Sequence, residues 1–365
     1  MSKTAAANER TGKTGPLAML LRRPEIGAVS GVVLILLMFA LVASGTMFSA
    51  RGILNWTTVA AQLGVVATAA CLLMIAGEFD LSIGSMIAFS GMLMALLVKF
   101  GGLPAWGAIL IGIAVSIAIG WSIGTLVVRT GLPSFIVSLA FLFVLRGATI
   151  VSSRVLNGST LVEGMRTFKD TDFVAWLFGG EIGRPLFDYL AAANVIDKLP
   201  NGAPAVTGIP MIVIWCLSVG VGASIVLSNS RFGNWIMATG GDREAARSLG
   251  VPVDRVRVLL FMFSAFCAAV FGAAQVFEYG SADAGRGQLK EFEAIIAAVI
   301  GGTLLTGGYG SVVGALLGSL IFGIVSQGFF YTGIDGDWFR IFLGCVLLGA
   351  VFLNTYVRKR ATGGL

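Results

Sequence analysis

The chain contains repeated apolar stretches of about 20 residues, separated by short polar or glycine-rich segments. Of its 365 residues, 56% are hydrophobic and only 12% are charged, whereas roughly a quarter of the residues of a soluble domain are charged. About 20 residues of helix cross the ~30 Å hydrocarbon layer of a bilayer. The excess of apolar residues therefore requires lipid, and we predict an all-α polytopic membrane protein.

We predict about ten transmembrane helices. The apolar stretches are 26–48, 57–76, 81–98, 104–128, 134–151, 209–228, 257–277, 292–307, 311–330 and 339–357. The first is longer than the apolar part of a signal peptide, which has about 7–15 residues, so we expect it to be retained. A transmembrane domain at 26–357 then lies between a polar segment at 1–25 and a basic tail at 358–365.

Basic residues predict the orientation of these helices. If all ten stretches cross, the segments on the side of the termini carry more Lys and Arg than the short loops opposite, which indicates cytoplasmic termini. Segment 152–208 is then a long external insertion with one or two short surface helices, and 229–257 is the longest cytoplasmic loop. The net charge of +6 is scattered over such loops and does not indicate a nucleic-acid partner.

Composition excludes several kinds of chemistry. The chain has no histidine and four isolated cysteines, so we expect neither a metal site nor a His-dependent catalytic pair. No GxxxxGK[ST] motif is present, so we expect no nucleotide site and no enzymatic activity in this chain. Patterns such as Gly120-x3-Gly124 and Gly314-x3-Gly318 indicate close helix packing rather than chemistry.

Residues 77–85 (GEFDLSIGS) place two carboxylates, Glu78 and Asp80, between two apolar stretches. Carboxylates flanked by membrane spans are costly unless they are solvated or paired. One interpretation is a cytoplasmic turn in which Asp80 or Ser82 caps the next helix. The other places Asp80 at a broken helix that lines a pathway.

The cytoplasmic loop contains a predicted short helix that begins at Asp242 and ends before Gly250 and Pro252. A capped, charged helix that projects from a membrane bundle is suited to bind a cytoplasmic partner. A merely solvated loop is the alternative.

A third segment begins with Glu291 and Glu293, whose charges suit the start of a helix. Glycine-rich breaks follow it, and such breaks also mark short helices or re-entrant backbone beside a pathway. The candidate gate residues in this segment are Glu291, Glu293, Gly301, Gly302, Gly307 and Gly308.

Four motifs together resemble the membrane permeases of bacterial sugar-importing ABC transporters, which include the ribose, xylose, arabinose and galactose permeases. The motifs are GEFDLSIGSMIAFSG, LPSFIVSLAFLFVLRG, GDREAARSLGV and EFEAIIAAVIGGTLLTGGYGSVVGALLGSLIFGIV. The resemblance covers about residues 30–355. The chain departs from the family pattern where it has Glu78-Phe79 in place of Gly-Ile and Ser138-Leu139-Ala140 in place of Thr-Leu-Gly.

The resemblance implies the ten-helix importer fold in the bacterial inner membrane and a dimer of permeases, either two copies or a copy and a paralogue. It also implies a periplasmic sugar-binding protein and a cytoplasmic ATPase, tandem or in two copies, which binds ATP and Mg. The loop resembles the coupling helix that contacts the ATPase. The coupling residues so implied are Asp242, Arg243, Glu244, Ala245, Ala246, Arg247 and Gly250.

Substrate contacts are the least constrained part of this interpretation. Sugars are bound by hydrogen bonds and aromatic stacking, and a pentose, hexose, polyol or nucleoside is compatible with the polar residues available. The pathway candidates are Asn55, Gln62, Asp80, Ser82, Ser85, Ser138, Gln275 and Gln327.

Two other classes of protein are the alternatives. An ion-coupled secondary transporter needs titratable groups at mid-membrane, whereas we expect Arg146 near an outer end of its span and Glu78, Asp80, Glu291 and Glu293 at span boundaries. A membrane-embedded enzyme would have few candidate catalytic groups, because the chain has no histidine and no cysteine pair.

Overall fold

The computed structural model describes residues 24–333 except 201, together with ten residues between 335 and 349. The predicted N-terminal segment, apart from its last two residues, and the C-terminal tail lie outside the described residues. Most of the last predicted span, 339–357, also lies outside them.

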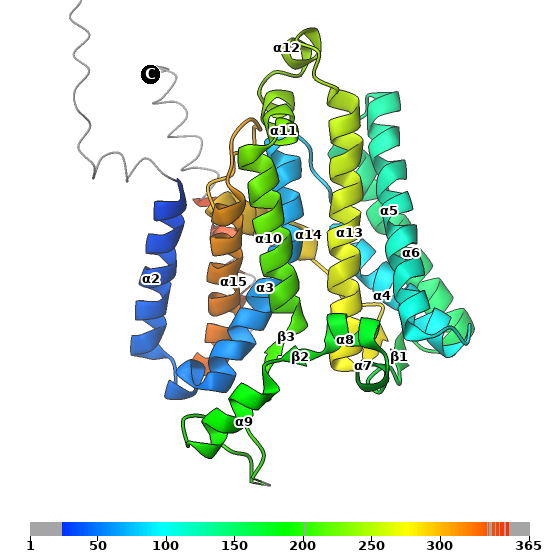
Figure 1. Cartoon of the computed structure of the whole chain (residues 1–365). Coiled ribbons are helices and arrows are strands. Elements are labelled where there is room, and N and C mark those ends of the chain that lie inside the picture. The colour runs from blue at the N-terminus through cyan, green and yellow to red at the C-terminus, as the bar shows by residue number, and fades with distance from the viewer. Residues whose placement is uncertain are drawn as a thin grey trace, which may run out of the picture.

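Within the described part of the chain, eight long helices form a bundle (Figure 1). They are α2 (Pro24–Val42), α3 (Ala50–Ile75), α4 (Ile83–Lys99), α5 (Ala105–Thr130), α6 (Ser134–Asn157), α10 (Met211–Asn229), α13 (Val253–Tyr279) and α15 (Val312–Thr332). Six of them, all but α2 and α4, are long and apolar enough to cross a membrane. The prediction of a polytopic helical membrane protein is confirmed.

Proline and glycine set the ends of several helices. α5 begins after Pro104 and ends before Gly131, and α6 begins after Pro133 and ends before Gly158. Both glycines have a left-handed backbone, with φ of 68° and 71°, which a residue with a Cβ adopts only at a cost. Hydropathy located both ends of α5 within two residues, whereas it ended α6 six residues before Asn157.

The predicted span at 292–307 is a much shorter helix. α14 (Lys290–Ile300) has 11 residues, or ~16 Å of helix, which is about half of the hydrocarbon thickness. Gly301 ends it, and residues 301–311 form a non-helical loop before α15. A full span at this position is therefore not confirmed, because the glycine-rich sequence terminates the helix early.

α3 is the central helix of the bundle. Residues 60–75 are buried without interruption, and α3 packs against α10, α13, α14 and α15 (Figure 1). α13 packs in turn against α4 and α5, where Gly120 and Gly124 of α5 meet the backbone of α13 at Phe261 and Val258. The glycine patterns therefore serve close helix packing, as predicted.

Short elements cover one end of the bundle. They are a 3-10 turn (Gly45–Phe48), β1 (Leu161–Glu163), α7 (Phe168–Thr171), α8 (Phe173–Gly179), β2 (Glu181–Ile182), α9 (Arg184–Ala192), β3 (Ile209–Pro210) and β4 (Ser281–Asp283). β1 pairs antiparallel with β4, and β2 pairs antiparallel with β3. The insertion thus holds three short helices, one more than the upper number expected.

α8 is anchored to the bundle, whereas α9 projects from it (Figure 1). The Trp215 indole of α10 donates a hydrogen bond of 2.8 Å to the Leu177 carbonyl of α8. In and directly after α9, the side chains of Leu186, Tyr189 and Val195 are largely exposed.

The opposite end of the bundle carries α11 (Arg231–Gly241) and α12 (Arg243–Ser248) (Figure 1). The sequence predicted the short helix α12 but not α11. Ser230 precedes α11 and caps it, because the Ser230 hydroxyl accepts a hydrogen bond from the Gly233 N–H.

Gly318 tests the close packing of α15 on α14. A Cβ on Gly318 would lie 2.0 Å from the Ala297 carbonyl oxygen, whereas nothing lies within 4 Å of a Cβ on Gly222. We expect Gly318→Ala to destabilise the protein by about 1–3 kcal/mol. Gly222→Ala serves as the control and is expected to be neutral or stabilising. Thermal unfolding in detergent measures the difference, and equal melting temperatures would contradict the packing described.

Candidate functional site

α12 is a capped surface helix. The Asp242 carboxylate accepts hydrogen bonds from the N–H groups of Glu244 and Ala245, at 3.1 and 3.0 Å. Ala246 faces the protein and is 3% exposed, and the chain turns at Gly250 with φ of 83°. The capping predicted for Asp242 is confirmed.

The outer side of α12 carries exposed charges. Arg247 contacts Glu244 at 3.4 Å and Asp254 of α13 at 2.6 Å. Its hydrogen bond to Asp254 raises the pKa of Arg247 above its ordinary value, and an arginine is charged at physiological pH in any case. α12 therefore presents fixed charges to the solvent.

Glycines bring three segments together just before α12. A Cβ on Gly240 would lie 1.8 Å from the Ile75 carbonyl oxygen, and one on Gly307 would lie 2.7 Å from the Gly240 carbonyl oxygen. The Gly308 N–H donates to the Ile75 carbonyl at 2.8 Å. The candidate gate residues Gly307 and Gly308 thus contact the end of α11, and Gly301 packs against Gly314 of α15.

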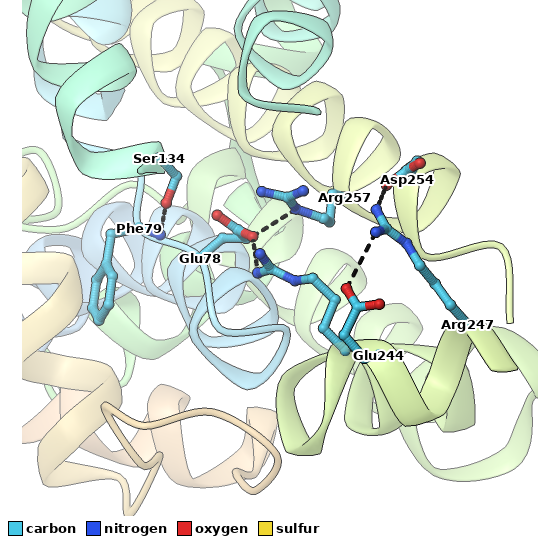
Figure 2. A network of polar contacts seen from close by, with 8 residues as sticks. Glu78, Phe79, Ser134, Glu244, Arg247, Asp254 and Arg257 are labelled. Carbon is cyan, nitrogen blue, oxygen red and sulfur yellow. Dashed lines mark hydrogen bonds and ion pairs between the residues drawn. The ribbon is translucent and has the colours of Figure 1, made fainter. Parts of the chain in front are cut away.

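Glu78 lies beneath α12 in a network of ion pairs (Figure 2). One of its carboxylate oxygens accepts from Arg243 at 2.5 Å and from Arg257 at 2.6 Å. The side chains of Glu78 and Arg257 are only 3% and 6% exposed, and that of Arg243 is 38% exposed. The sequence indicated a costly charge at Glu78 but no site role for it. Its partners, Arg243 and Arg257, are 165 and 179 residues away in the chain, so no local pattern reveals them.

The segment that follows Glu78 is fastened to α6 and α13. The N–H groups of Phe79 and Leu81 donate to the hydroxyls of Ser134 and Ser138 of α6, at 3.0 and 2.9 Å. Because these N–H groups have no helical partner, the two serines satisfy backbone that would otherwise be costly in a bundle. Ser138, a predicted pathway residue, therefore contacts this segment.

Asp80 is buried rather than exposed in a solvated turn. One carboxylate oxygen accepts from the Ser82 N–H at 2.9 Å and the Ser82 hydroxyl at 2.6 Å, and the other accepts from the Ser264 hydroxyl of α13 at 2.7 Å. Ser82 precedes α4 without a side-chain capping bond. Ser82 is therefore not a side-chain cap of α4, whereas Asp80 bonds to Ser82 directly before α4 and to α13. The role of Asp80 in a pathway stays a prediction.

Glu291 and Glu293 lie in the first turn of α14, as predicted, but they are 5% and 9% exposed. Glu293 pairs with Lys290. Among the described residues, the Glu291 Oε2 atom has no hydrogen-bond partner. The acids at 78, 80, 291 and 293 thus lie next to helix ends, as expected, but they are buried within the bundle.

Arg146 is a further charged residue whose partners lie within the protein. It lies near the middle of α6 and donates to the carbonyls of Ala284 and Arg286, at 2.6 and 3.0 Å. These carbonyls belong to the loop between α13 and α14, so a side chain predicted near an outer end holds this loop against α6.

Gln62 and Gln275 meet in a second polar cluster, between α3 and α13. Gln275 donates to Gln62 at 3.4 Å, and Gln62 donates to the Tyr279 hydroxyl at 3.1 Å and also contacts Glu278. Arg286 lies over the Tyr279 ring at 5.3 Å. We did not predict Glu278 or Arg286 as site residues from the sequence. The only feature that could have indicated them is that they are charged and follow the apolar stretch 257–277.

The remaining pathway candidates are not brought into either cluster. Asn55 donates to the Tyr331 hydroxyl at 3.2 Å in an exposed position, and Gln327 is half-buried on α15. Ser85 is fully buried at the start of α4, and its hydroxyl has no partner among the residues described.

Comparison with known proteins decides the family. Residues 52–351 match the family model described as the permease component of the branched-chain amino acid transport system. The chain belongs to this permease family. Because the match spans most of the permease, it covers both polar clusters and the loop that contains α12.

Similar proteins include three bacterial permeases. A probable ABC transporter permease protein of Escherichia coli K12 is 30% identical over 93% of this permease and 91% of its own length. The xylose transport system permease protein of the same strain is 27% identical, with 91% and 92% covered. The fructose import permease protein of Rhizobium meliloti is 29% identical, with 90% and 85% covered.

Asp80 provides a test of the polar network at residues 78–82 of the permease. Asp80→Ala removes the acceptor of three hydrogen bonds, and each buried donor left without a partner costs about 1–3 kcal/mol. We expect solute uptake to fall strongly at matched levels of inserted protein. Asp80→Asn keeps an acceptor oxygen and is expected to retain more uptake than Asp80→Ala. Normal uptake by Asp80→Ala would show that this carboxylate has no part in transport.

Proposed function

We propose that this chain is the membrane-spanning permease of an ATP-driven importer that depends on a binding protein, and that it provides the path for a sugar by alternating access. Family membership supports the permease role, and the names of relatives that act on xylose and fructose support the substrate class. As an importer of this class, it works as a dimer in the bacterial inner membrane with both termini cytoplasmic, and its partner subunits bind ATP and Mg.

The observation that carries this proposal is α12. A short helix with a confirmed cap and exposed charges stands at one end of the bundle, and it is connected through Arg243 to the buried segment at Glu78. An exposed helix joined to buried polar residues is suited to pass movement from a cytoplasmic ATPase into the bundle. Residues 242–250 are therefore our proposed coupling element.

Glu244 and Gly250 test the coupling assignment. Glu244→Lys reverses a charge that is 82% exposed, and Gly250→Pro cannot adopt the observed φ of 83°. We expect both variants to be inserted in the membrane but to lose ATP-dependent uptake and association with the ATPase. Arg129→Gln, at the exposed end of α5, is the control. Unchanged uptake by the first two variants would refute the assignment.

The cluster around Gln62 is our proposed sugar contact. Gln62, Gln275 and Glu278 offer amide and carboxylate groups that hydrogen-bond hydroxyls, and the Tyr279 ring is half-exposed beside them. A nucleoside or another small polar solute is the alternative substrate within the same class.

An ion-coupled carrier remains the alternative from another class. The burial of Asp80 and Glu291 favours it more than the sequence alone did. Family membership and the structure of α12 favour the ATP-driven importer, because an ion-coupled carrier gives no reason for a capped cytoplasmic helix.

α9 is our proposed contact for the binding protein. The strands β2 and β3 pair directly on either side of the excursion that contains α9, so residues 184–206 can be replaced by a short Gly-Ser turn that leaves both strands in place. We expect the shortened permease to retain basal ATPase activity of the complex and to lose its stimulation by the binding protein. Equal loss of both activities would indicate misfolding and contradict a docking role.

A further inference from the structure

Two ion pairs connect α12 to the rest of the protein, and they differ in their surroundings. The Arg247–Asp254 pair is exposed on both sides, at 43% and 51%, and such surface pairs contribute little because water competes for both groups. The Arg243–Glu78 pair ends on a carboxylate that is 3% exposed. The contact with Glu78 is therefore the firmer of the two.

Glu78 also holds Arg257 of α13, and both arginines bind the same carboxylate oxygen (Figure 2). One carboxylate thus serves two guanidinium groups. Separating a buried ion pair is expensive, so Glu78 is held to α13 through Arg257 while it remains in contact with the first residue of α12 through Arg243.

Residues 79–82 connect Glu78 to the interior. Phe79 and Leu81 bond to α6, and Asp80 bonds to Ser264 of α13. α4 begins directly after this segment, at Ile83, and Gly84 leaves room for the Glu291 carboxylate of α14, which would lie 2.0 Å from a Cβ at that position. A displacement of Glu78 therefore reaches α4, α6 and α14 within a few residues.

We infer that Glu78 is a positioning residue that transmits movement of α12 to residues 77–82, with Arg243 as the moving contact and Arg257 as the anchor. This inference rests on the proposed function, because it requires that an ATPase moves α12. It assigns to Glu78 a role that lies outside the proposed coupling residues 242–250.

The test compares hydrogen exchange in the intact complex, purified through a tag on this chain, before and after trapping with ATP and vanadate. In the unsubstituted protein, trapping changes exchange both at residues 243–249 and at residues 79–82. In Arg243→Gln the change in exchange at α12 persists, and the change at residues 79–82 is lost. Arg243→Lys keeps the positive charge and therefore retains part of the change at residues 79–82. Arg129→Gln is the matched control and retains both changes.

Glu78→Gln breaks the same contact from the other side, so it loses the change at 79–82 as well, and the double variant shows no further loss beyond either single variant. Glu78→Gln also leaves buried Arg257 without its carboxylate. If Glu78→Gln does not fold for this reason, the exchange measured in Arg243→Gln alone tests the inference. A change at 79–82 that persists in Arg243→Gln overturns the inference.

Two further outcomes separate this inference from the proposed function. Loss of the changes at both segments in Arg243→Gln, together with loss of the bound ATPase, shows that Arg243 acts on the ATPase directly, and overturns the inference alone. An unsubstituted protein whose α12 does not respond to trapping refutes the coupling function, and the inference falls with it.

Discussion

Backbone that leaves its helix inside a membrane bundle must find hydrogen-bond partners within the protein, because lipid offers none. The break between α3 and α4 imposes this requirement most strongly, since it also carries the buried carboxylates of Glu78 and Asp80. Its partners come from α6, from α13 and from the start of α12. This one segment therefore connects α6, α12 and α13 through its hydrogen bonds and ion pairs.

The same constraint explains why the polar residues collect where helices are interrupted. α14 is about half as long as a span and begins with two buried glutamates, and its other end runs into the loop whose glycines contact the end of α11. The break between α3 and α4 and the loop after α14 therefore approach each other near α12. The start of α14 contacts the start of α4 at Gly84. Movement at the end of the bundle that carries α12 is not isolated from the interior, because the interrupted helices are in direct contact.

Local patterns in the sequence predicted most of the fold. Apolar length placed the long helices, and Asp242 predicted the start of α12. The burial of Glu78 and Asp80 was not predictable from local patterns, since it depends on Arg243, Arg257 and Ser264, far away in the chain. Hydropathy also treated residues 292–307 as one span, because it registers the apolar content of the segment but not the end of a helix at Gly301.

The most direct test of the central claim is to purify the tagged chain in mild detergent from its native host and to identify by mass spectrometry the proteins that accompany it. We expect an ABC-type ATPase subunit and a periplasmic sugar-binding protein in the eluate. A chain that purifies alone, and that transports solute in liposomes without ATP, would contradict the account and identify an ion-coupled carrier instead.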